Sequence, residues 1–242
     1  PEFGQQPVDQ LPWGHNMVLI TKVKNPVNRE WYIRACIEHG WSRAVLVHQI
    51  ESDLYERQGK ALTNFEQALP APQSDLAREL VKDPYNLEFV GFSDPINERE
   101  LERSLLDHLK DFLLELGKGF AFVGSQYHME VGEQDYYLDL LFYNYILRAF
   151  VVIDLKVGAF QPEFAGKMNF YLNAVDELLR HPDDQPPIGL ILCRERDRIT
   201  VEFSLRGMTQ PMGVSEYQLL PKNVRDALPT PEQLEAELEK AD

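Results

Sequence analysis

The sequence predicts an α/β protein in which helices flank a mixed sheet and a small helical domain precedes that core. Residues 1–69 show helical spacing of apolar side chains with capping residues between the runs. Residues 120–156 instead hold successive strand-like runs separated by short polar turns. An amphipathic helix on each side of these runs and a buried strand after them complete the order α-β-β-β-α-β, which is typical of a mixed sheet.

Composition excludes several classes of protein. Of the 242 residues, 44% are hydrophobic and 11% aromatic, so the chain is not disordered, and no apolar run approaches the roughly 20 residues of a membrane-spanning helix. The two cysteines, Cys36 and Cys193, argue against a disulfide framework or a cysteine metal site and favour a reducing cytoplasm. The net charge of −15 is opposite to that of typical nucleic-acid binders. An anionic ligand would therefore meet a local basic patch or bound cations.

The first helices are defined by their capping residues. We expect helices at 16–23, at 28–38 and from Ser42 to about Gly59, with Gly40 ending the second of them. Three short helices with a tight turn between the last two resemble a helix-turn-helix or a truncated winged helix. Residues 1–69 are assigned to this domain, residues 70–96 to a linker with one short helix at 74–81, and residues 97–242 to the main domain.

The main domain begins with one long amphipathic helix at 97–116, ended by glycines. Strands are expected after it, followed by a helix, two more strands and an acidic terminal helix. Their ranges are 120–123, 126–131, 136–143 and 148–156 for the first strands, 163–180 for the helix, 188–193 and 200–205 for the later strands, and 231–240 for the last helix.

Charged residues interrupt two apolar strands of this domain. Asp139 lies within the first, and Asp154 and Lys156 share one face of the second because strand side chains alternate. In an antiparallel hairpin Asp139 can lie beside Asp154, and two such carboxylates repel unless a cation neutralises them. Hard oxygen ligands suit Mg²⁺ or Mn²⁺, and the lysine can hold a phosphate or act on an attacking water. The alternative is a simple Asp154–Lys156 salt bridge at the exposed end of a strand.

Asp139, a short hairpin and Asp154-Leu155-Lys156 resemble the signature of the PD-(D/E)xK nuclease superfamily, whose core has the same α-β-β-β-α-β order. Segments over nearly the whole chain are similar to the YhcG-type family of bacterial nucleases. They are Leu11–Asn16, Trp31–Tyr32, Gly40–Arg43, Gln49–Gly59, Asn64–Phe65, Phe120–Gly124, Gln126–His128, Tyr171–Asp176 and Gly213–Tyr217. The resemblance implies a restriction-endonuclease-like fold and a metal-dependent DNA endonuclease.

The resemblance also implies roles for individual residues. Asp139 and Asp154 correspond to the metal-binding acidic positions, and Lys156 to the catalytic lysine. Relatives often have Glu where Asp154 stands. Glu102 is the candidate for a further catalytic and metal-binding carboxylate on the preceding helix, and Glu98 is its rival at i−4 on the same helical face. The implied reaction is hydrolysis of a phosphodiester with Mg²⁺ or Mn²⁺ as cofactor, on branched or Holliday-like DNA by analogy, and by a homodimer because a symmetric junction needs two cuts.

Residues outside this constellation are candidates for DNA contacts. Arg43 and Gln49 lie on the helix after the tight turn, and Gln161 and Lys167 lead into the helix after the lysine strand. Each is equally consistent with an ordinary solvated helix. An alternative function is a catalytically degenerate module that binds nucleic acid or assembles with other proteins. A third interpretation is that the acidic surface engages a basic protein partner and the nuclease is restrained until it is needed. Metal-dependent cleavage separates the active endonuclease from both alternatives.

Overall fold

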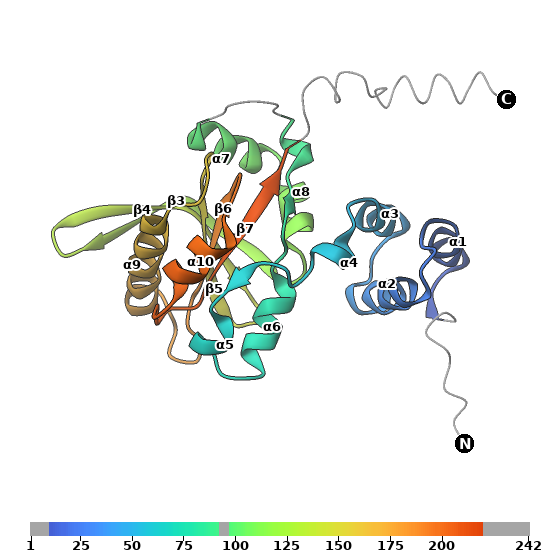
Figure 1. Cartoon of the computed structure of the whole chain (residues 1–242), viewed down its shortest axis with the longest axis horizontal. Coiled ribbons are helices and arrows are strands. Elements are labelled where there is room, and N and C mark those ends of the chain that lie inside the picture. The colour runs from blue at the N-terminus through green and yellow to red at the C-terminus, as the bar shows by residue number, and fades with distance from the viewer. Residues whose placement is uncertain (1–9, 92–96, 220–242) are drawn as a thin grey trace.

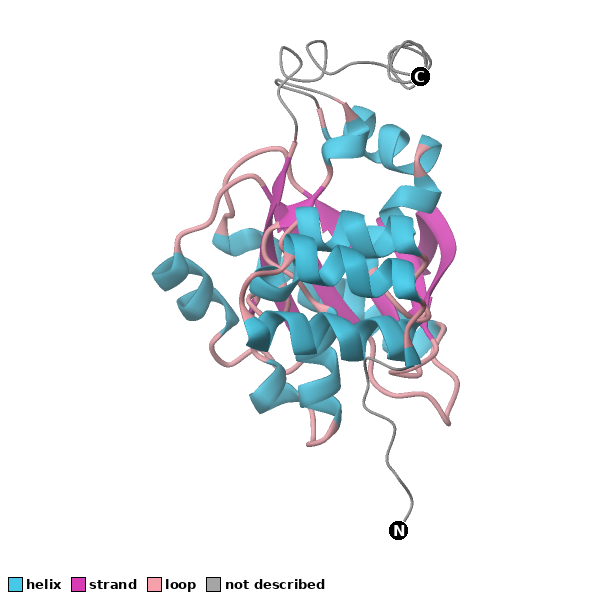
Figure 2. Ribbon diagram, turned by 90° about the vertical axis from the view of Figure 1, so that its right-hand side faces the viewer, coloured by secondary structure: helices cyan, strands magenta, loops and turns pink. Residues whose placement is uncertain are grey.

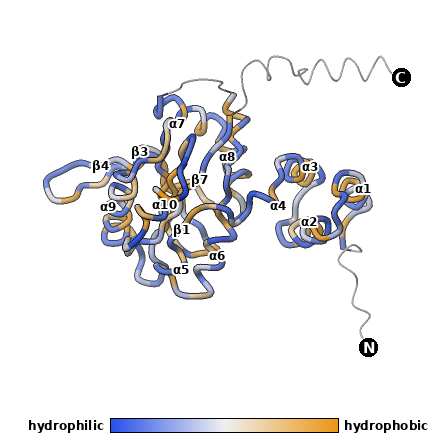
Figure 3. Tube along the Cα trace, in the orientation of Figure 1, coloured by the Kyte–Doolittle hydropathy of each residue, from blue (hydrophilic) through white to orange (hydrophobic). Residues whose placement is uncertain are grey.

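The protein was analysed as a computed structural model that describes residues 10–91 and 97–219. Figure 1 shows two parts: a group of short helices, α1 to α4, and a larger body built around a sheet. Each part has a hydrophobic core of its own. In Figure 3 the orange hydrophobic stretches accordingly occur in both parts.

The helical module is built from four helices. They are α1 (Trp13–Lys22), α2 (Pro26–His39), α3 (Arg43–Glu51) and α4 (Leu54–Arg57). Gly40 ends α2 in the left-handed conformation, and the Ser42 hydroxyl accepts a hydrogen bond from the Val45 N–H, as the tight turn predicts. The single helix expected from Ser42 to Gly59 is wrong, because the chain turns at Asp53, which has a φ of 51°.

The sheet confirms the predicted mixed architecture. Its strand order is β1-β7-β6-β5-β4-β3, with β2 pairing with β7. β3, β4 and β5 are antiparallel neighbours, whereas β5, β6 and β7 run parallel. The strands are β1 (Leu62–Thr63), β2 (Tyr85–Asn86), β3 (Phe120–Val131), β4 (Gln134–Asn144), β5 (Ala149–Leu155), β6 (Ile188–Cys193) and β7 (Met212–Gln218).

Helices cover both faces of this sheet, and Figure 2 shows helices in front of the magenta strands. α9 (Pro162–Leu178) and α10 (Arg198–Leu205) pack on one face, while α7 (Glu98–Asp107) and α8 (Leu109–Leu116) pack on the other. The long helix expected at 97–116 is thus two helices, because the backbone leaves the helical conformation at His108.

One predicted strand is wrong. Residues 200–205 belong to α10, whose first turn is capped by the Asp197 side chain accepting from the Thr200 N–H. Val201 and Leu205 are buried at a spacing of four residues, which is the period of a helix face. The missing strand is β7, whose Gly, Ser and Glu residues weaken its apolar pattern.

The described residues that follow the helical module form short elements that pack on the sheet body. β1 pairs with β7 in antiparallel orientation, and the short helices α5 (Phe65–Ala68) and α6 (Gln73–Leu80) follow it. β2 then pairs with β7 in parallel orientation. A short 3-10 helix, η2 (Glu88–Val90), then contributes to the core under α7. Residues 58–91 therefore pack as part of the sheet body, and we propose a domain division near Arg57 rather than a linker at 70–96.

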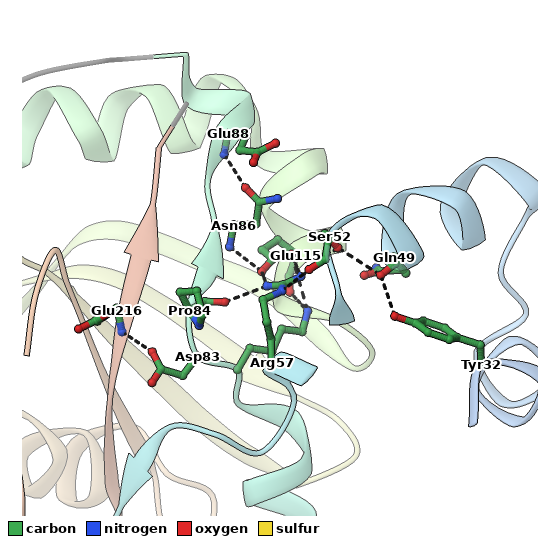
Figure 4. A network of polar contacts seen from close by, with 11 residues as sticks. Tyr32, Gln49, Ser52, Arg57, Asp83, Pro84, Asn86, Glu88, Glu115 and Glu216 are labelled. Carbon is green, nitrogen blue, oxygen red and sulfur yellow. Dashed lines mark hydrogen bonds and ion pairs between the residues drawn. The ribbon is translucent and has the colours of Figure 1, made fainter. Parts of the chain in front are cut away.

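The two parts meet at a buried ion pair between Arg57 of α4 and Glu115 of α8, 2.5 Å apart (Figure 4). Among the described residues, none of the helices combines the length and apolar character needed to span a bilayer. The acidic helix expected at 231–240 lies outside the described residues.

Candidate active site

Two neighbouring antiparallel strands bring the predicted carboxylates together. Leu140 of β4 pairs with Ile153 of β5 in antiparallel register. Continuing that register by one residue puts Asp139, which precedes Leu140, opposite Asp154, which follows Ile153. The Asp139 Oδ2 accepts a hydrogen bond of 3.0 Å from the Leu155 N–H, which fixes its carboxylate against β5. Asp154 is only 2% exposed, and Asp139 is half-buried. The site lies where β4 begins to project beyond β5.

The two carboxylates destabilise each other as anions. Burial, and after it the nearby charge of Asp154, raise the pKa of Asp139 from 3.8 to about 6. The Leu155 N–H, Lys156 and Lys167 act in the opposite direction. A group with these properties holds its negative charge reluctantly and would gain from a divalent cation.

Lys156 is buried against the acidic pair. Its Nζ lies 2.7 Å from Asp154 Oδ2 and 3.7 Å from an oxygen of Glu98, and it donates a 3.1 Å hydrogen bond to the Leu155 carbonyl. The Phe164 ring of α9 lies 5.2 Å from the ammonium group. Lys156 is 5% exposed, so its charge depends on these partners for compensation.

α9 supplies a second cation. Lys167 Nζ lies 3.3 Å from Asp154 Oδ1 and 5.1 Å from the centre of the Tyr171 ring. Burial lowers the pKa of Lys167, but Asp154, Tyr171 and Asp139 outweigh it, so the net shift is upward. Each Asp154 oxygen thus faces one ammonium group. The sequence analysis placed Lys167 among the DNA contacts. Its ion pair with Asp154 joins α9 to β5, and no local sequence pattern indicates such a pairing.

The two candidate glutamates of α7 lie in different surroundings. Glu102 is buried and accepts a 2.5 Å hydrogen bond from Gln126 of β3, whereas exposed Glu98 reaches Lys156. Burial raises the pKa of Glu102, while the bond from Gln126 lowers it. Gln126 has a φ of 43° and lies just past an irregularity in the β3–β4 register between Phe122 and Gly124. The sequence analysis did not select Gln126, because a register irregularity cannot be recognised from the alternation of apolar and polar residues.

The donor set suits a divalent ion only in part. Asp139 and Asp154 are adjacent hard-oxygen donors, as Mg²⁺ and Mn²⁺ prefer. Within residues 10–91 and 97–219, however, no three His, Cys, Asp or Glu side chains are grouped closely enough to hold a metal. That Glu102 is the third ligand stays a prediction, and in this arrangement its carboxylate accepts a hydrogen bond from Gln126.

The residues predicted to contact DNA differ in their exposure to solvent. Arg43 is exposed on α3 and borders a shallow groove with His48 and Glu51. Gln49 is 3% exposed, and its backbone carbonyl accepts a bond from the buried Tyr32 hydroxyl. The assignment of Gln49 to DNA binding is therefore wrong, because its side chain faces the module's core. Gln161 is exposed immediately before α9.

Comparison with known proteins places this geometry in a family. The model of the YhcG PDDEXK nuclease domain matches residues 78–239, and that of the DUF1016 N-terminal domain matches residues 1–57. The chain is 38% identical over 205 residues, 84% of its length, to the Escherichia coli (strain K12) protein named "Putative nuclease YhcG". It spans about half of that relative, 55%.

A solved structure is also similar over part of the fold. It is the crystal structure of a repair endonuclease from Pyrococcus abyssi, 11% identical with a TM-score of 0.36, over 54% of this chain and 50% of that one. The family itself rests on the domain model, which covers well over half of the chain and includes both site strands. The chain belongs to the YhcG PDDEXK nuclease family.

Proposed function

We propose that this protein is a metal-dependent DNA endonuclease that hydrolyses phosphodiester bonds in the cytoplasm, where its free buried thiols Cys36 and Cys193 stay reduced. The observation that carries the proposal is the grouping of Asp139, in the middle of β4, with Asp154 and Lys156 at the end of β5. Membership of a nuclease family supports the same reaction.

Asp139 and Asp154 are the residues that would hold Mg²⁺ or Mn²⁺. When bound, the ion supplies a more acidic water and stabilises negative charge on phosphate oxygens. The carboxylate of Asp139 is fixed in advance by the Leu155 N–H, so it presents its free oxygen in one orientation.

Lys156 supplies a fixed positive charge to this site. Its ammonium group is held between Asp154, the Leu155 carbonyl and Glu98, and it retains a position from which it can orient an attacking water or bind a phosphate oxygen. Lys167 adds a second, more exposed ammonium group on α9. We assign Lys167 and Gln161 to contacts with DNA phosphates beside the site, and Arg43 to a separate contact from the helical module.

A binding module with an inactive nuclease core is the second candidate. It is favoured by one observation: both oxygens of Asp154 face lysines, and no third acidic group joins the pair among the described residues. In that protein the lysines would neutralise the carboxylates permanently, and DNA would bind without being cut.

The testing experiment measures cleavage with Mg²⁺, Mn²⁺ or EDTA. Asp139→Asn, Asp154→Asn and Lys156→Gln are each expected to reduce the rate by about 100-fold or more. Asn is used at position 154 because, unlike Ala, its amide oxygen still offers the buried ammonium of Lys156 a hydrogen-bond acceptor. The control is Asp135→Asn, which changes an exposed carboxylate of the same strand.

Full metal-dependent activity in Asp139→Asn would refute the site, and DNA binding without cleavage by the wild type would favour the second candidate. The same assay compares duplex, single-stranded and four-way-junction DNA. We propose junction-like DNA as substrate and a homodimer as the active species, and light scattering that shows a monomer at assay concentration would refute the dimer.

A further inference from the structure

One buried tyrosine touches both the proposed catalytic lysine and an arginine that has no role so far. Tyr217 lies near the end of β7, is 3% exposed, and pairs with Tyr85 of β2. Its hydroxyl donates a 3.1 Å hydrogen bond to the Lys156 carbonyl. The guanidinium of Arg194 lies over the aromatic ring of Tyr217, 5.7 Å from the ring centre.

The hydroxyl completes the support of Lys156. β5 ends at Leu155, so Lys156 is the first residue beyond the strand. Its N–H donates a 2.8 Å bond to the Leu192 carbonyl, and its carbonyl accepts from Tyr217. Both backbone polar groups of Lys156 are thereby held in a buried place, and the direction of its side chain depends on that hold.

Arg194 occupies the equivalent place on the next strand. It is the first residue after β6, and its N–H donates a 3.0 Å bond to the Gly158 carbonyl. Arg194 is half-buried, yet within the described residues its guanidinium makes no ion pair, in contrast to nearby Arg196, which pairs with Asp83. Arg194 and Glu98 both lie close enough to Tyr217 to influence its pKa, which burial raises to about 12.

An arginine without an ion pair at the carboxyl end of β6 is suited to bind a phosphate group. The chain carries a net charge of −15, so a half-buried cation left without a carboxylate partner is conspicuous. A guanidinium presents a fork of N–H donors that matches a phosphate, and its aromatic support limits the entropy lost when it binds.

We propose that Arg194 binds a backbone phosphate of the nucleic acid at this site. In this proposal Tyr217 is the positioning residue that holds Lys156 and Arg194 at the neighbouring carboxyl ends of β5 and β6. The proposal rests on the proposed function and extends it by a phosphate contact. Arg194 binds the substrate, and the hydroxyl of Tyr217 acts through Lys156.

The first arm measures binding of a short DNA duplex in Ca²⁺ at several salt concentrations, which requires no cleavage. Arg194→Gln is expected to weaken binding about tenfold at low salt and to reduce the slope of log K against log salt by about 1. Arg206→Gln is the matched control, because Arg206 also lies over an aromatic ring, that of Phe203, but at the far end of α10. The control is expected to keep the slope.

The second arm separates the hydroxyl from the ring. Tyr217→Phe keeps the ring under Arg194 and is expected to lower kcat by about 10- to 100-fold with KM and the salt slope unchanged. Tyr85→Phe is the control, because within the described residues that buried hydroxyl makes no hydrogen bond of normal geometry. The NMR signal of the Lys156 side chain, followed in both variants, is expected to move only in Tyr217→Phe, whether or not the protein cleaves DNA.

The outcomes distinguish the two proposals. If the wild type binds and cuts DNA but Arg194→Gln behaves like Arg206→Gln, the phosphate contact is refuted and the nuclease stands. If Tyr217→Phe only lowers Tm and leaves kcat and the Lys156 signal unchanged, Tyr217 is a structural residue and its positioning role is refuted. If the wild type neither binds nor cuts DNA, both proposals fall.

Discussion

At the scale of single residues, the site is a balance between two carboxylates and two ammonium groups. Asp154 is buried between Lys156 and Lys167, whereas among residues 10–91 and 97–219 the one direct partner of Asp139 is the Leu155 N–H. Asp139 is therefore the member whose charge is least compensated, as its raised pKa shows. If this site binds a cation as we propose, the repulsion between its carboxylates lowers the free energy of unfolding when the cation is absent.

This imbalance predicts opposite effects of one substitution with and without metal. At pH 8, where Asp139 is ionised, Asp139→Asn is expected to stabilise the metal-free protein by about 1 kcal/mol, because it removes a repulsion and keeps an acceptor for the Leu155 N–H. Mg²⁺ or Mn²⁺ is expected to raise Tm in the wild type through binding to the folded state, and not in the variant. Thermal unfolding with EDTA and with each ion measures both. An unchanged metal response in Asp139→Asn would show that the ion binds elsewhere.

Sequence reasoning reached some site residues and missed others for a physical reason. Asp139, Asp154 and Lys156 could be grouped because strand alternation and a short hairpin fix which side chains share a face. The choice between Glu98 and Glu102 could not be made, because both lie on one face of α7 and only packing decides which of them approaches β5.

At the scale of elements, strongly apolar strands were predictable and weakly patterned ones were not. The range of β6 matches its prediction, whereas β7 was missed and α10 was taken for a strand. The predicted domain boundary at residue 69 differs from the division near Arg57 that we propose, because β1 has only two residues and is ordered by its pairing with β7. Tertiary pairing, which no local pattern records, determines such short strands.

Asn64 shows what holds β1 in place and gives a test. It is 3% exposed; its amide donates to the carbonyls of Met208 and Gln210, and its oxygen accepts a 2.8 Å bond from the Met212 N–H. Asn64→Ala would leave buried backbone groups unpaired, so we expect a loss of about 2–3 kcal/mol in the free energy of unfolding. Urea unfolding measures it against Gln67→Ala, an exposed control on α5. A loss below about 0.5 kcal/mol would show that residues 58–69 do not anchor to the sheet.

At the scale of the whole molecule, polar contacts rather than a shared hydrophobic core join the helical module to the sheet body. Arg57 contacts Glu115, the Pro84 carbonyl and Ser52, as Figure 4 shows. Lys118 reaches across to the carbonyl of Glu38 at the end of α2. The buried pair between Arg57 and Glu115 adds little net stability, because the desolvation of both charges offsets much of their attraction.

Lys82 lies in the same junction and makes it sensitive to pH. It is 5% exposed, and its Nζ donates to the Glu115 carbonyl and lies 4.0 Å from a Glu115 carboxylate oxygen. Burial lowers the pKa of Lys82 to about 8, Glu115 acts against the shift, and Arg57 adds to it. Between about pH 8 and the ordinary lysine pKa of 10.5, the unfolded chain holds this proton and the folded chain does not. Raising the pH through that window therefore favours the folded state at this residue.

The prediction concerns the difference between the wild type and Lys82→Met. The variant removes the buried charge but leaves the Arg57–Glu115 pair, so near pH 7 it is expected to be at least as stable as the wild type. As pH rises from 8 toward 10, the wild type is expected to gain stability relative to the variant. Other titrating groups are common to both proteins and cancel in the difference. Urea unfolding at pH 7, 8, 9 and 9.5 measures it, with exposed Lys110→Met of α8 as the control. A constant difference across this range would mean that Lys82 keeps its proton in the folded state, and the junction would then hold three buried charges rather than two.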